Sequence, residues 1–571
     1  MRKNDVLTET IKDYGYNCEG ICKSGDTVCF VPYTLVNEKV CFKVLKVNKN
    51  VAYCKALEIL TPEEDRVRPV CRVYGKCGGC QLQHLVYSEQ LKLKSKIVAD
   101  CFRKIAGIKA DVNQTVPSKN EYGYRNKLQL PVRHTEYGNA IGFFAENSHR
   151  VIKVDDCPIQ KSGAKEIIAA FNEFIIQCGV SCYDESTGEG LLRHIVARFI
   201  GDAAVITVVI NGKTLPRVND LIDILSASFK KFSLYLNENT ENNNVITGEN
   251  YTLVYGEGSY FNEEFSVKYP VTVQSFMQVN DDVKVKLYSH VVSTVEKFKA
   301  NVVIDAYSGA GVMTAMLASY CDRIIGIEII PEAVSAADAL KNGNAALKNK
   351  MTNVCAPCEK VLPGIVERET QSGNKVAVVF DPPRKGCDIK VISALLKSKP
   401  EHIVYVSCSP QTLARDAGLL VGTLEYDGEK IVRGSDCGVY EITEITPFDM
   451  FPQTKHVETL VVLSKKIPDS HINIDVEFGE GEGQFSLKKI KERADERKPK
   501  EKVTYKMIQE YIEQTYGFKV HTAYIAEVKR DVGLPMYDAP NAVEELKRPR
   551  AHPTPRMVEA IKETLKHFEI I

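Results

Sequence analysis

Apolar residues in the second half of the chain gather in short runs, and longer stretches with helical spacing separate these runs. Valine and isoleucine dominate the runs, which is typical of strands that are buried on both faces of a sheet. Strands that alternate with helices in this way form parallel sheets. We therefore predict an α/β domain over residues 271–468, with strands in VVIDAY, RIIGIEI, KVAVVFDPP, HIVYVSC and ETLVVLSKK.

The first sixty residues show a different pattern, in which short β-like runs alternate with turn signals. Val, Phe, Tyr and Cys fill the runs, and Gly and Asn fall between them. This pattern predicts a small β-barrel over residues 1–62. The stretch TPEEDRVRP then reads as a linker, and a central domain of mixed pattern follows over residues 63–270.

The last hundred residues are polar, and we predict a basic linker and a small helical appendage over residues 469–571. Residues 486–506 hold nine Lys or Arg against four acids. The next stretch predicts a helix, a turn at Gly517 and a second helix capped near Thr522. One face of the first helix would carry Ile508, Tyr511, Ile512 and Thr515. The appendage is either a helix-turn-helix-like RNA-binding element or a helical packing module.

Composition narrows the setting without naming a partner. The 571 residues are 44% hydrophobic and 26% charged, and the formal net charge is zero, so any nucleic-acid binding must come from local patches. No apolar run approaches the ~20 residues of a membrane span, and the polar N-terminus has no signal segment. We therefore expect a cytoplasmic protein without membrane contact, whose 18 cysteines are ligands, nucleophiles or core residues.

Three cysteines stand close together in the glycine-rich stretch CRVYGKCGGC. Its glycines let the backbone fold so that several thiolates converge on one ion or cluster. A tetrahedral zinc site or a [4Fe-4S] cluster needs four ligands, and DDCPIQ supplies a candidate fourth. We predict a metal site formed by Cys71, Cys77, Cys80 and Cys157. Core cysteines are the alternative, and the spacing does not separate zinc from iron–sulfur.

The stretch VVIDAYSGAGVMTAML combines an apolar strand, an acid, a glycine loop and a helix. Gly309 and Gly311 allow a tight turn and close approach to a ligand. Glu328 ends the next strand, where an acid can accept both hydroxyls of a ribose. Because the full G-x-G-x-x-G is absent, a single nucleoside such as S-adenosylmethionine is favoured over a dinucleotide. A purely structural turn is the alternative.

Two further strand ends carry reactive side chains, Asp381 in DPPRKG and Cys408 in YVSCSP. Ligands of open α/β folds bind at this carboxyl edge of the sheet. A thiolate that adds to carbon-6 of uracil makes carbon-5 nucleophilic toward an electrophilic methyl group. A base must then remove the carbon-5 proton, and Glu458 in HVETLVVL is the candidate. Taken singly, Cys408 would be interpreted as a buried cysteine and Glu458 as a surface or paired acid.

Six motifs now stand in order along the chain: SFMQVN, DAYSGAG, GIEI, DPPRKG, YVSCSP and HVETLVVL. In these the chain closely resembles the iron–sulfur branch of the bacterial RNA (uracil-5) methyltransferases that act on 23S ribosomal RNA. The resemblance covers about residues 1–468. It implies an OB-like TRAM barrel, a central iron–sulfur RNA-binding domain and a Rossmann-like S-adenosylmethionine methyltransferase domain, followed by the helical extension.

The resemblance also implies roles for single residues. It assigns a [4Fe-4S] cluster to the four cysteines, and it makes Cys408 the nucleophile and Glu458 the proton acceptor. It assigns cofactor contacts to Gln278, Tyr307, Glu328 and Asp381. We expect a monomer that binds ribosomal RNA. The alternatives are a transfer-RNA uracil-5 methyltransferase and, in another class, a noncatalytic iron–sulfur RNA-binding factor for ribosome assembly.

Two segments of the central domain mix aromatic and basic residues. YGYRNKLQLPVRH and GLLRHIVAR would suit stacking on unpaired bases and contact with phosphates. The alternative is that both segments are edge strands with solvated faces. A target uridine must leave its stack to reach a buried nucleophile, which favours a loop or junction of folded RNA.

Overall fold

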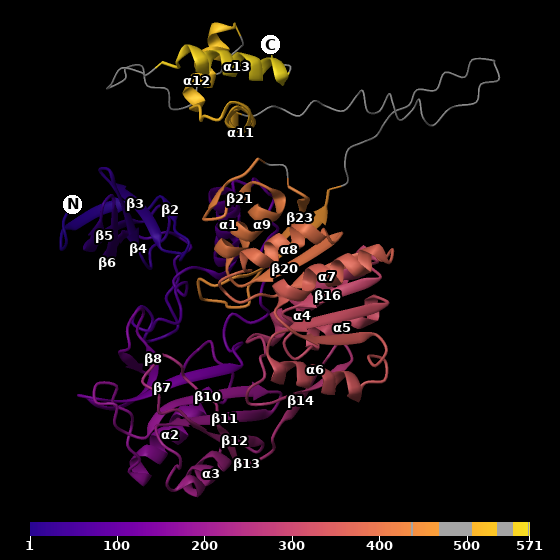
Figure 1. Cartoon of the computed structure of the whole chain (residues 1–571). Helices are drawn as coiled ribbons and strands as arrows, with labels where there is room; N and C mark the ends of the chain where they lie inside the picture. The colour runs from indigo at the N-terminus through magenta and orange to yellow at the C-terminus, as the bar shows by residue number, and fades with distance from the viewer. Residues whose placement is uncertain (436–437, 467–504, 534–551, 569, 571) are drawn as a thin grey trace. The chain divides into compact units, whose positions relative to one another are not determined.

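A computed structural model describes residues 1–435, 438–466, 505–533, 552–568 and 570 (Figure 1). The chain divides into two compact units, residues 1–469 and residues 470–571. No helix in the described part of the chain is both long and apolar enough to cross a membrane.

The N-terminal region is one six-stranded sheet in the order β1-β5-β6-β4-β3-β2. Alternate side chains of its strands pack with Ile11 into a small core that includes Val31, Phe42 and Val44. This confirms the predicted β-rich N-terminus. The strands are β1 (Val6–Thr10), β2 (Asp13–Tyr14), β3 (Gly20–Ser24), β4 (Thr27–Val31), β5 (Lys39–Asn48) and β6 (Val51–Thr61).

The central region is a seven-stranded sheet in the order β13-β12-β11-β10-β7-β8-β9. Helices α2 (Ala164–Cys178) and α3 (Val218–Ser226) supply apolar side chains to a core with Leu, Ile and Val of its middle strands. The strands are β7 (Lys127–Thr135), β8 (Gly138–Phe144), β9 (Val151–Lys153), β10 (Leu192–Ile200), β11 (Ala203–Ile210), β12 (Phe232–Glu238) and β13 (Tyr251–Tyr255).

The two basic segments form β7 and β10, which pair with each other inside this sheet. The interpretation as edge strands is therefore wrong, and their charged residues are largely buried. A short hairpin of β14 (Tyr260–Glu264) and β15 (Val267–Val271) leads to the α/β domain. Helix α1 (Tyr87–Cys101) packs near that domain, against α9.

The second large sheet has the order β18-β17-β16-β19-β20-β24-β23. Its first five strands are parallel neighbours, and β24 runs antiparallel between β20 and β23. The predicted parallel α/β sheet is thus confirmed for four of the five predicted strands, whereas ETLVVLSKK forms the antiparallel β24. The strands are β16 (Val302–Ala306), β17 (Arg323–Glu328), β18 (Met351–Cys355), β19 (Val376–Phe380), β20 (His402–Ser407), β23 (Tyr440–Phe448) and β24 (Glu458–Lys465).

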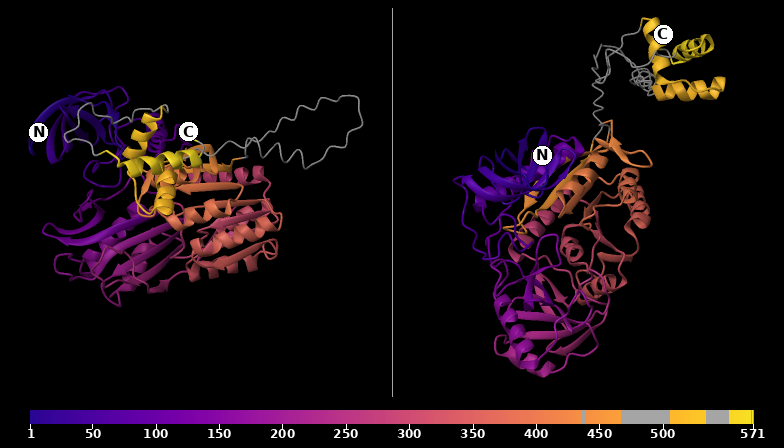
Figure 2. Two further views of the ribbon diagram at one scale, coloured as in Figure 1. Left: turned by 45° about the horizontal axis from the view of Figure 1, so that its top comes forward. Right: turned by 90° about the vertical axis from the view of Figure 1, so that its left-hand side faces the viewer.

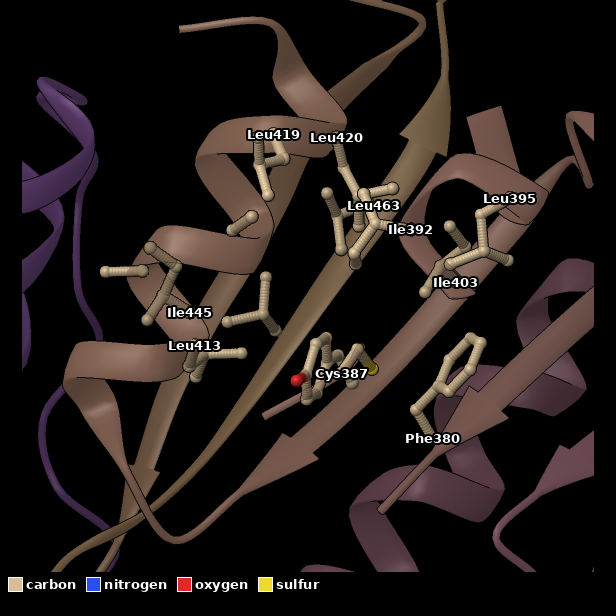
Figure 3. Close-up of a cluster of buried hydrophobic side chains, with 14 of the residues drawn as sticks. Phe380, Cys387, Ile392, Leu395, Ile403, Leu413, Leu419, Leu420, Ile445 and Leu463 are labelled. Carbon is tan, nitrogen blue, oxygen red and sulfur yellow. The ribbon is translucent and has the colours of Figure 1, made fainter. Parts of the chain in front are cut away.

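Helices cover both faces of this sheet because successive strand residues point to opposite sides (Figure 2). Helices α4 (Asp281–Phe298), α5 (Val312–Leu317) and α6 (Pro331–Gly343) pack on the face that Val303 and Val404 share. Helices α7 (Cys358–Gln371), α8 (Ile389–Ser398) and α9 (Pro410–Val421) cover the other. Figure 3 shows side chains of β19, β20, β24, α8 and α9 meeting in that second core. A small hairpin, β21 (Leu424–Tyr426) and β22 (Ile431–Arg433), follows α9.

The second unit contains α11 (Tyr505–Tyr516), α12 (Thr522–Asp531) and α13 (Pro555–His567). Gly517 forms the predicted turn with a positive φ of 73°, and His521 rather than Thr522 caps α12. Ile508 and Ile512 are buried as predicted, whereas Thr515 is exposed. The predicted basic linker lies outside the described residues except for its last two positions.

Candidate active site

Four of the predicted site residues lie at one edge of the second sheet. Strands β17, β16, β19 and β20 are parallel neighbours, so their carboxyl ends meet at the same edge. Glu328 ends β17, and Asp381 and Cys408 directly follow β19 and β20. Tyr307 directly follows β16. The sheet therefore brings together side chains that are separated by up to a hundred residues.

Glu458 reaches the same edge from the opposite direction. Because β24 runs antiparallel to β20, the first residue of β24 lies beside the last residues of β20. Ser407 pairs with Thr459, which places Cys408 and Glu458 next to each other across the two strands. The sheet order thus joins the predicted nucleophile to the predicted base.

Burial controls the protonation of both groups. The side chain of Glu458 is 4% exposed, and this burial raises its pKa to about 8, with a further contribution from the Asp381 carboxylate. Burial also raises the pKa of the Cys408 thiol, and the charge of Glu458 adds to that rise. The Arg384 guanidinium lowers the pKa of both groups. The site therefore holds two weak acids whose ionisation depends on one nearby cation.

Arg384 was not singled out from the sequence, although it belongs to DPPRKG. Its loop is tied to α9, because the backbone oxygen of Arg384 accepts a bond from Thr412 Oγ1 at 3.2 Å. The buried Asp416 accepts the Cys387 amide at 2.8 Å and the Tyr405 hydroxyl at 2.7 Å. Arg384 therefore sits in a loop that is fixed beside the site.

The glycine loop after β16 is held open by backbone bonds. Tyr307 has a left-handed φ of 68°, and its amide and that of Ser308 both donate to the Ile327 carbonyl at 3.0 Å. Gly311 is required, because a Cβ there would lie 2.7 Å from Ala337 Cβ. The acid of the motif, Asp305, is buried and accepts a hydrogen bond from Thr314 Oγ1 at 2.6 Å. This bond joins the end of β16 to α5 and so stabilises the loop between them.

The Glu328 carboxylate lies half-buried beside this loop. One oxygen accepts the Gly309 amide at 3.0 Å, and the other accepts the Ile329 and Ile330 amides at 2.8 and 2.9 Å. These bonds fix its direction, and Oε2 retains a lone pair for a further donor such as a ribose hydroxyl. The geometry is compatible with the predicted cofactor role.

Gln278 lies just before α4 and is buried. Asn126, directly before β7, donates to the Gln278 carbonyl at 3.0 Å and to Asp281 Oδ1 at 2.8 Å. The SFMQVN segment is thus anchored to the central sheet. Tyr288 on α4 was missed, since a helical tyrosine gives no motif. Burial raises its pKa, and the charge of Asp381 adds to that rise.

The four predicted metal ligands line one cavity of about 330 Å³, together with Arg384 and His456. Gly78 approaches the chain so closely that a Cβ would lie 3.0 Å from Glu146 Cα, and the Gly79 amide donates to Cys77 Sγ at 3.4 Å. Burial raises the pKa of Cys80 and of Cys157 to about 12. No three metal-binding side chains in the described residues converge to a ready coordination geometry.

Comparison with known proteins decides the family. Residues 86–466 match the tRNA (uracil-5-)-methyltransferase family. The chain belongs to this family. An uncharacterized RNA methyltransferase of Clostridium acetobutylicum is 36% identical over 471 residues, covering 81% of this chain and 98% of its own. Another of Staphylococcus aureus is 36% identical over 471 residues, covering 82% of this chain and 99% of its own.

A solved structure extends the comparison to the fold. Pyrococcus abyssi tRNA (uracil-54, C5)-methyltransferase, in complex with S-adenosyl-L-homocysteine, superposes with a TM-score of 0.62 at 26% identity. The match covers 80% of this chain and all of that one. This uracil-5 methyltransferase therefore has the S-adenosylmethionine-dependent α/β fold that the sequence predicted, and its substrate class is RNA.

Proposed function

We propose that this methyltransferase modifies carbon-5 of a uridine in 23S ribosomal RNA through a covalent bond between Cys408 and the uracil. The observation that carries the proposal is the pairing of Ser407 with Thr459. This pairing puts a thiol and a buried carboxyl side by side at the cofactor edge of the sheet.

The proposed reaction uses the two groups in turn. The Cys408 thiolate adds to carbon-6 of the uracil, and the carbon-5–carbon-6 electron pair moves toward the carbonyl oxygen at carbon-4. Carbon-5 is then nucleophilic, and bound S-adenosylmethionine would supply the electrophilic methyl group and leave as S-adenosylhomocysteine. Glu458 removes the carbon-5 proton, the double bond re-forms, and the carbon–sulfur bond breaks to return the thiolate. Arg384 stabilises the ionised forms of both groups.

The residues at the cofactor edge fit a nucleoside with a charged amino-acid tail. Glu328 would accept a ribose hydroxyl, and Tyr307, which directly follows β16, would offer its ring for stacking. Asp381 is an exposed carboxylate at the strand end, and Gln278 offers an amide. We propose these four residues as the cofactor contacts.

We propose that the cysteine cavity holds a [4Fe-4S] cluster through Cys71, Cys77, Cys80 and Cys157. Four thiols that line one cavity match such a cluster in number and chemistry. Burial raises the pKa of the Cys77, Cys80 and Cys157 thiols, so binding iron to these cysteines must displace protons. The cluster would brace the loop that lies between the central sheet and Arg384.

Transfer RNA is the second candidate substrate. The family is named for transfer RNA, and the superposed Pyrococcus abyssi protein is a tRNA (uracil-54, C5)-methyltransferase. The resemblance to the ribosomal branch rests on the barrel and the cysteine set together. Both candidates use the same chemistry, so they differ only in RNA recognition.

The deciding experiment uses RNA from a strain that lacks this gene. The purified enzyme and radiolabelled S-adenosylmethionine are incubated separately with its 23S ribosomal RNA and with its transfer RNA, and labelled fragments are mapped by mass. We expect 5-methyluridine in the 23S RNA. Label in transfer RNA alone would favour the second candidate, and label in neither RNA would reject both.

A further inference from the structure

A cavity of about 560 Å³ lies in the central region, away from the predicted cofactor edge. Arg133 on β7 and Arg193 and His194 on β10 form part of its lining. We call it the arginine cavity. Its size falls within the usual ~300–1,000 Å³ of small-ligand pockets.

A β-bulge explains why two polar residues stand together on β10. Leu192 pairs with Ile210 and His194 pairs with Val209, so Arg193 is an extra residue without a partner on β11. Leu192 and Ile195 on either side contribute to the apolar core with α2 and α3. The bulge thus allows Arg193 and His194 to line the cavity while the strand keeps its apolar face.

The charges around the cavity do not balance. Arg133 and Arg193 are only 7% and 3% exposed. Arg133 has one acidic neighbour, Glu185, at 3.6 Å, and Glu185 is shared with His149. Arg193 donates to the backbone oxygens of Asn239 and Glu241 and to the side-chain oxygen of Asn239, and within the described residues it forms no ion pair.

Several buried nitrogen atoms here also make no hydrogen bond in the described structure. They are Nε of Arg133, Nε of Arg193 and Nδ1 of His194. A buried cation without a full complement of bonds is costly, and an arriving anion would remove that cost. A phosphate suits paired guanidinium groups in particular.

Aromatic rings stand among these cations. Arg193 lies 4.6 Å and Arg133 5.3 Å from the centroid of Tyr183, and Arg133 also lies 5.6 Å from that of Phe144. The His149 ring, 5.7 Å from Phe144, is exposed at the rim. Exposed amides of residues 242–244 complete the lining. Cations, ring faces and amides are what proteins use to bind phosphate, stack a base and contact its edge.

We propose that the arginine cavity binds one unstacked nucleotide of the substrate RNA, at a distance along the strand from the target uridine. Gly78 lines both this cavity and the cysteine cavity, and the cysteine cavity also contains Arg384. Lys455, three residues before Glu458, lines the arginine cavity as well. An RNA strand can thus pass from the active site across the cysteine loop. This inference rests on the proposed RNA methylation.

The test uses the full-length protein with AMP, GMP, CMP and UMP as separate probes, detected by saturation-transfer NMR. We expect base signals with the wild type and at least tenfold weaker binding in Arg193→Gln. Because Arg193 is buried, a second variant places negative charge at exposed positions, Asn242→Asp with Asn244→Asp. Its neutral control is the same pair changed to Ser. Arg217→Gln changes an exposed arginine directly before α3 and is the matched control for Arg193.

Methylation kinetics provide the second readout. The Asp pair should raise the KM for RNA about tenfold, with most of the effect on KM rather than on kcat, and the Ser pair and Arg217→Gln should not. Nucleotide binding that survives both cavity variants, or an unchanged KM in the Asp pair, would overturn the inference. A wild type that binds nucleotides here and methylates no RNA would instead reject the proposed function.

Discussion

Burial of Glu458 acts on stability and on proton transfer in opposite directions. A carboxyl whose pKa in the folded protein is about 8 instead of its ordinary 4.5 favours the folded state when protonated. Its contribution to the free energy of unfolding is complete below about pH 4.5 and is lost as the pH rises through about 8. Yet Glu458 can accept a proton only when it is ionised, so the proposed chemistry needs the less stable form.

Replacing Glu458 with Gln should therefore separate the two effects. Above pH 8 the free energy of unfolding of the variant should exceed that of the wild type by on the order of 1–3 kcal/mol. The variant should therefore unfold at a higher temperature. It should also accumulate a covalent RNA adduct, seen as a shifted band on a denaturing gel, because carbon-5 keeps its proton. If no adduct forms while Cys408 is intact, the base lies elsewhere.

Replacing Cys408 with Ala should abolish methylation and leave cofactor binding nearly unchanged. The thiol acts on the base and does not belong to the cofactor loop. Methyl transfer is measured with labelled S-adenosylmethionine, and binding of S-adenosylhomocysteine is measured by calorimetry. Turnover close to that of the wild type would exclude Cys408 as the nucleophile.

Arg384 should set the pH dependence of the reaction. Both Cys408 and Glu458 must lose a proton to act, so kcat should rise with pH toward about 8. Arg384→Gln removes the cation that lowers both pKa values, and the rising limb of the pH profile should move to higher pH. Arg384→Lys keeps the charge and serves as the control. Superimposable profiles for the wild type and the Gln variant would contradict this role.

At the residue scale, the sequence predicted those candidate site residues that stand in a recognisable motif. Cys408, Glu458 and Asp381 were found because each follows or begins an apolar run. Tyr288 was missed, since its relevance depends on how α4 packs. The sequence also could not reveal that Arg384 affects the pKa of both Cys408 and Glu458. These two residues are fifty positions apart in the chain, and only the pairing of β20 with β24 brings them together.

At the scale of the element, the cysteine loop of residues 71–80 allows a direct test of the proposed cluster. Anaerobically purified protein should be brown and contain about four irons per chain. Cys77→Ser should lower the iron content, because a hydroxyl is a poor substitute for a thiolate ligand. Cys178→Ser, at the end of α2, is the matched control and should keep its iron. Zinc in place of iron in protein handled without air would contradict the assignment.

Strand identity was easier to predict than strand position. The apolar runs of β16, β17, β19, β20 and β24 were all predicted, because each carries its own hydrophobic pattern. The place of β24 between β20 and β23 was not, since pairing is decided by residues on other strands. For the same reason β7 and β10 were considered as possible edge strands, because their many charged residues resemble the solvated face of an edge strand.

At the scale of the whole molecule, the second unit has a core of its own. Side chains of α11, α12 and α13 form it, among them Ile508, Ile512, Ile525, Ile561 and Leu565. The family match ends at residue 466, before this unit begins. Every residue that we assign to catalysis or to the cofactor lies in the first unit.

A chain that ends at Pro468 should therefore keep its turnover number on saturating RNA. Its RNA affinity should fall, because the nine cations of residues 486–506 are lost with the second unit. The slope of log affinity against log salt should become shallower, as expected when fewer phosphates are neutralised. A truncated enzyme that binds RNA normally and cannot transfer the methyl group would show that the second unit completes the active site.

The internal position of β24 has a consequence during protein synthesis. It is the last strand of the first unit to leave the ribosome, and it pairs on both sides. Until it emerges, β20 is an open, strongly apolar sheet edge of the kind that pairs with other chains. A nascent or prematurely terminated chain thus lacks Glu458 and exposes an adhesive strand at the same time. Such products should be inert, and they should be targets for chaperones and proteases.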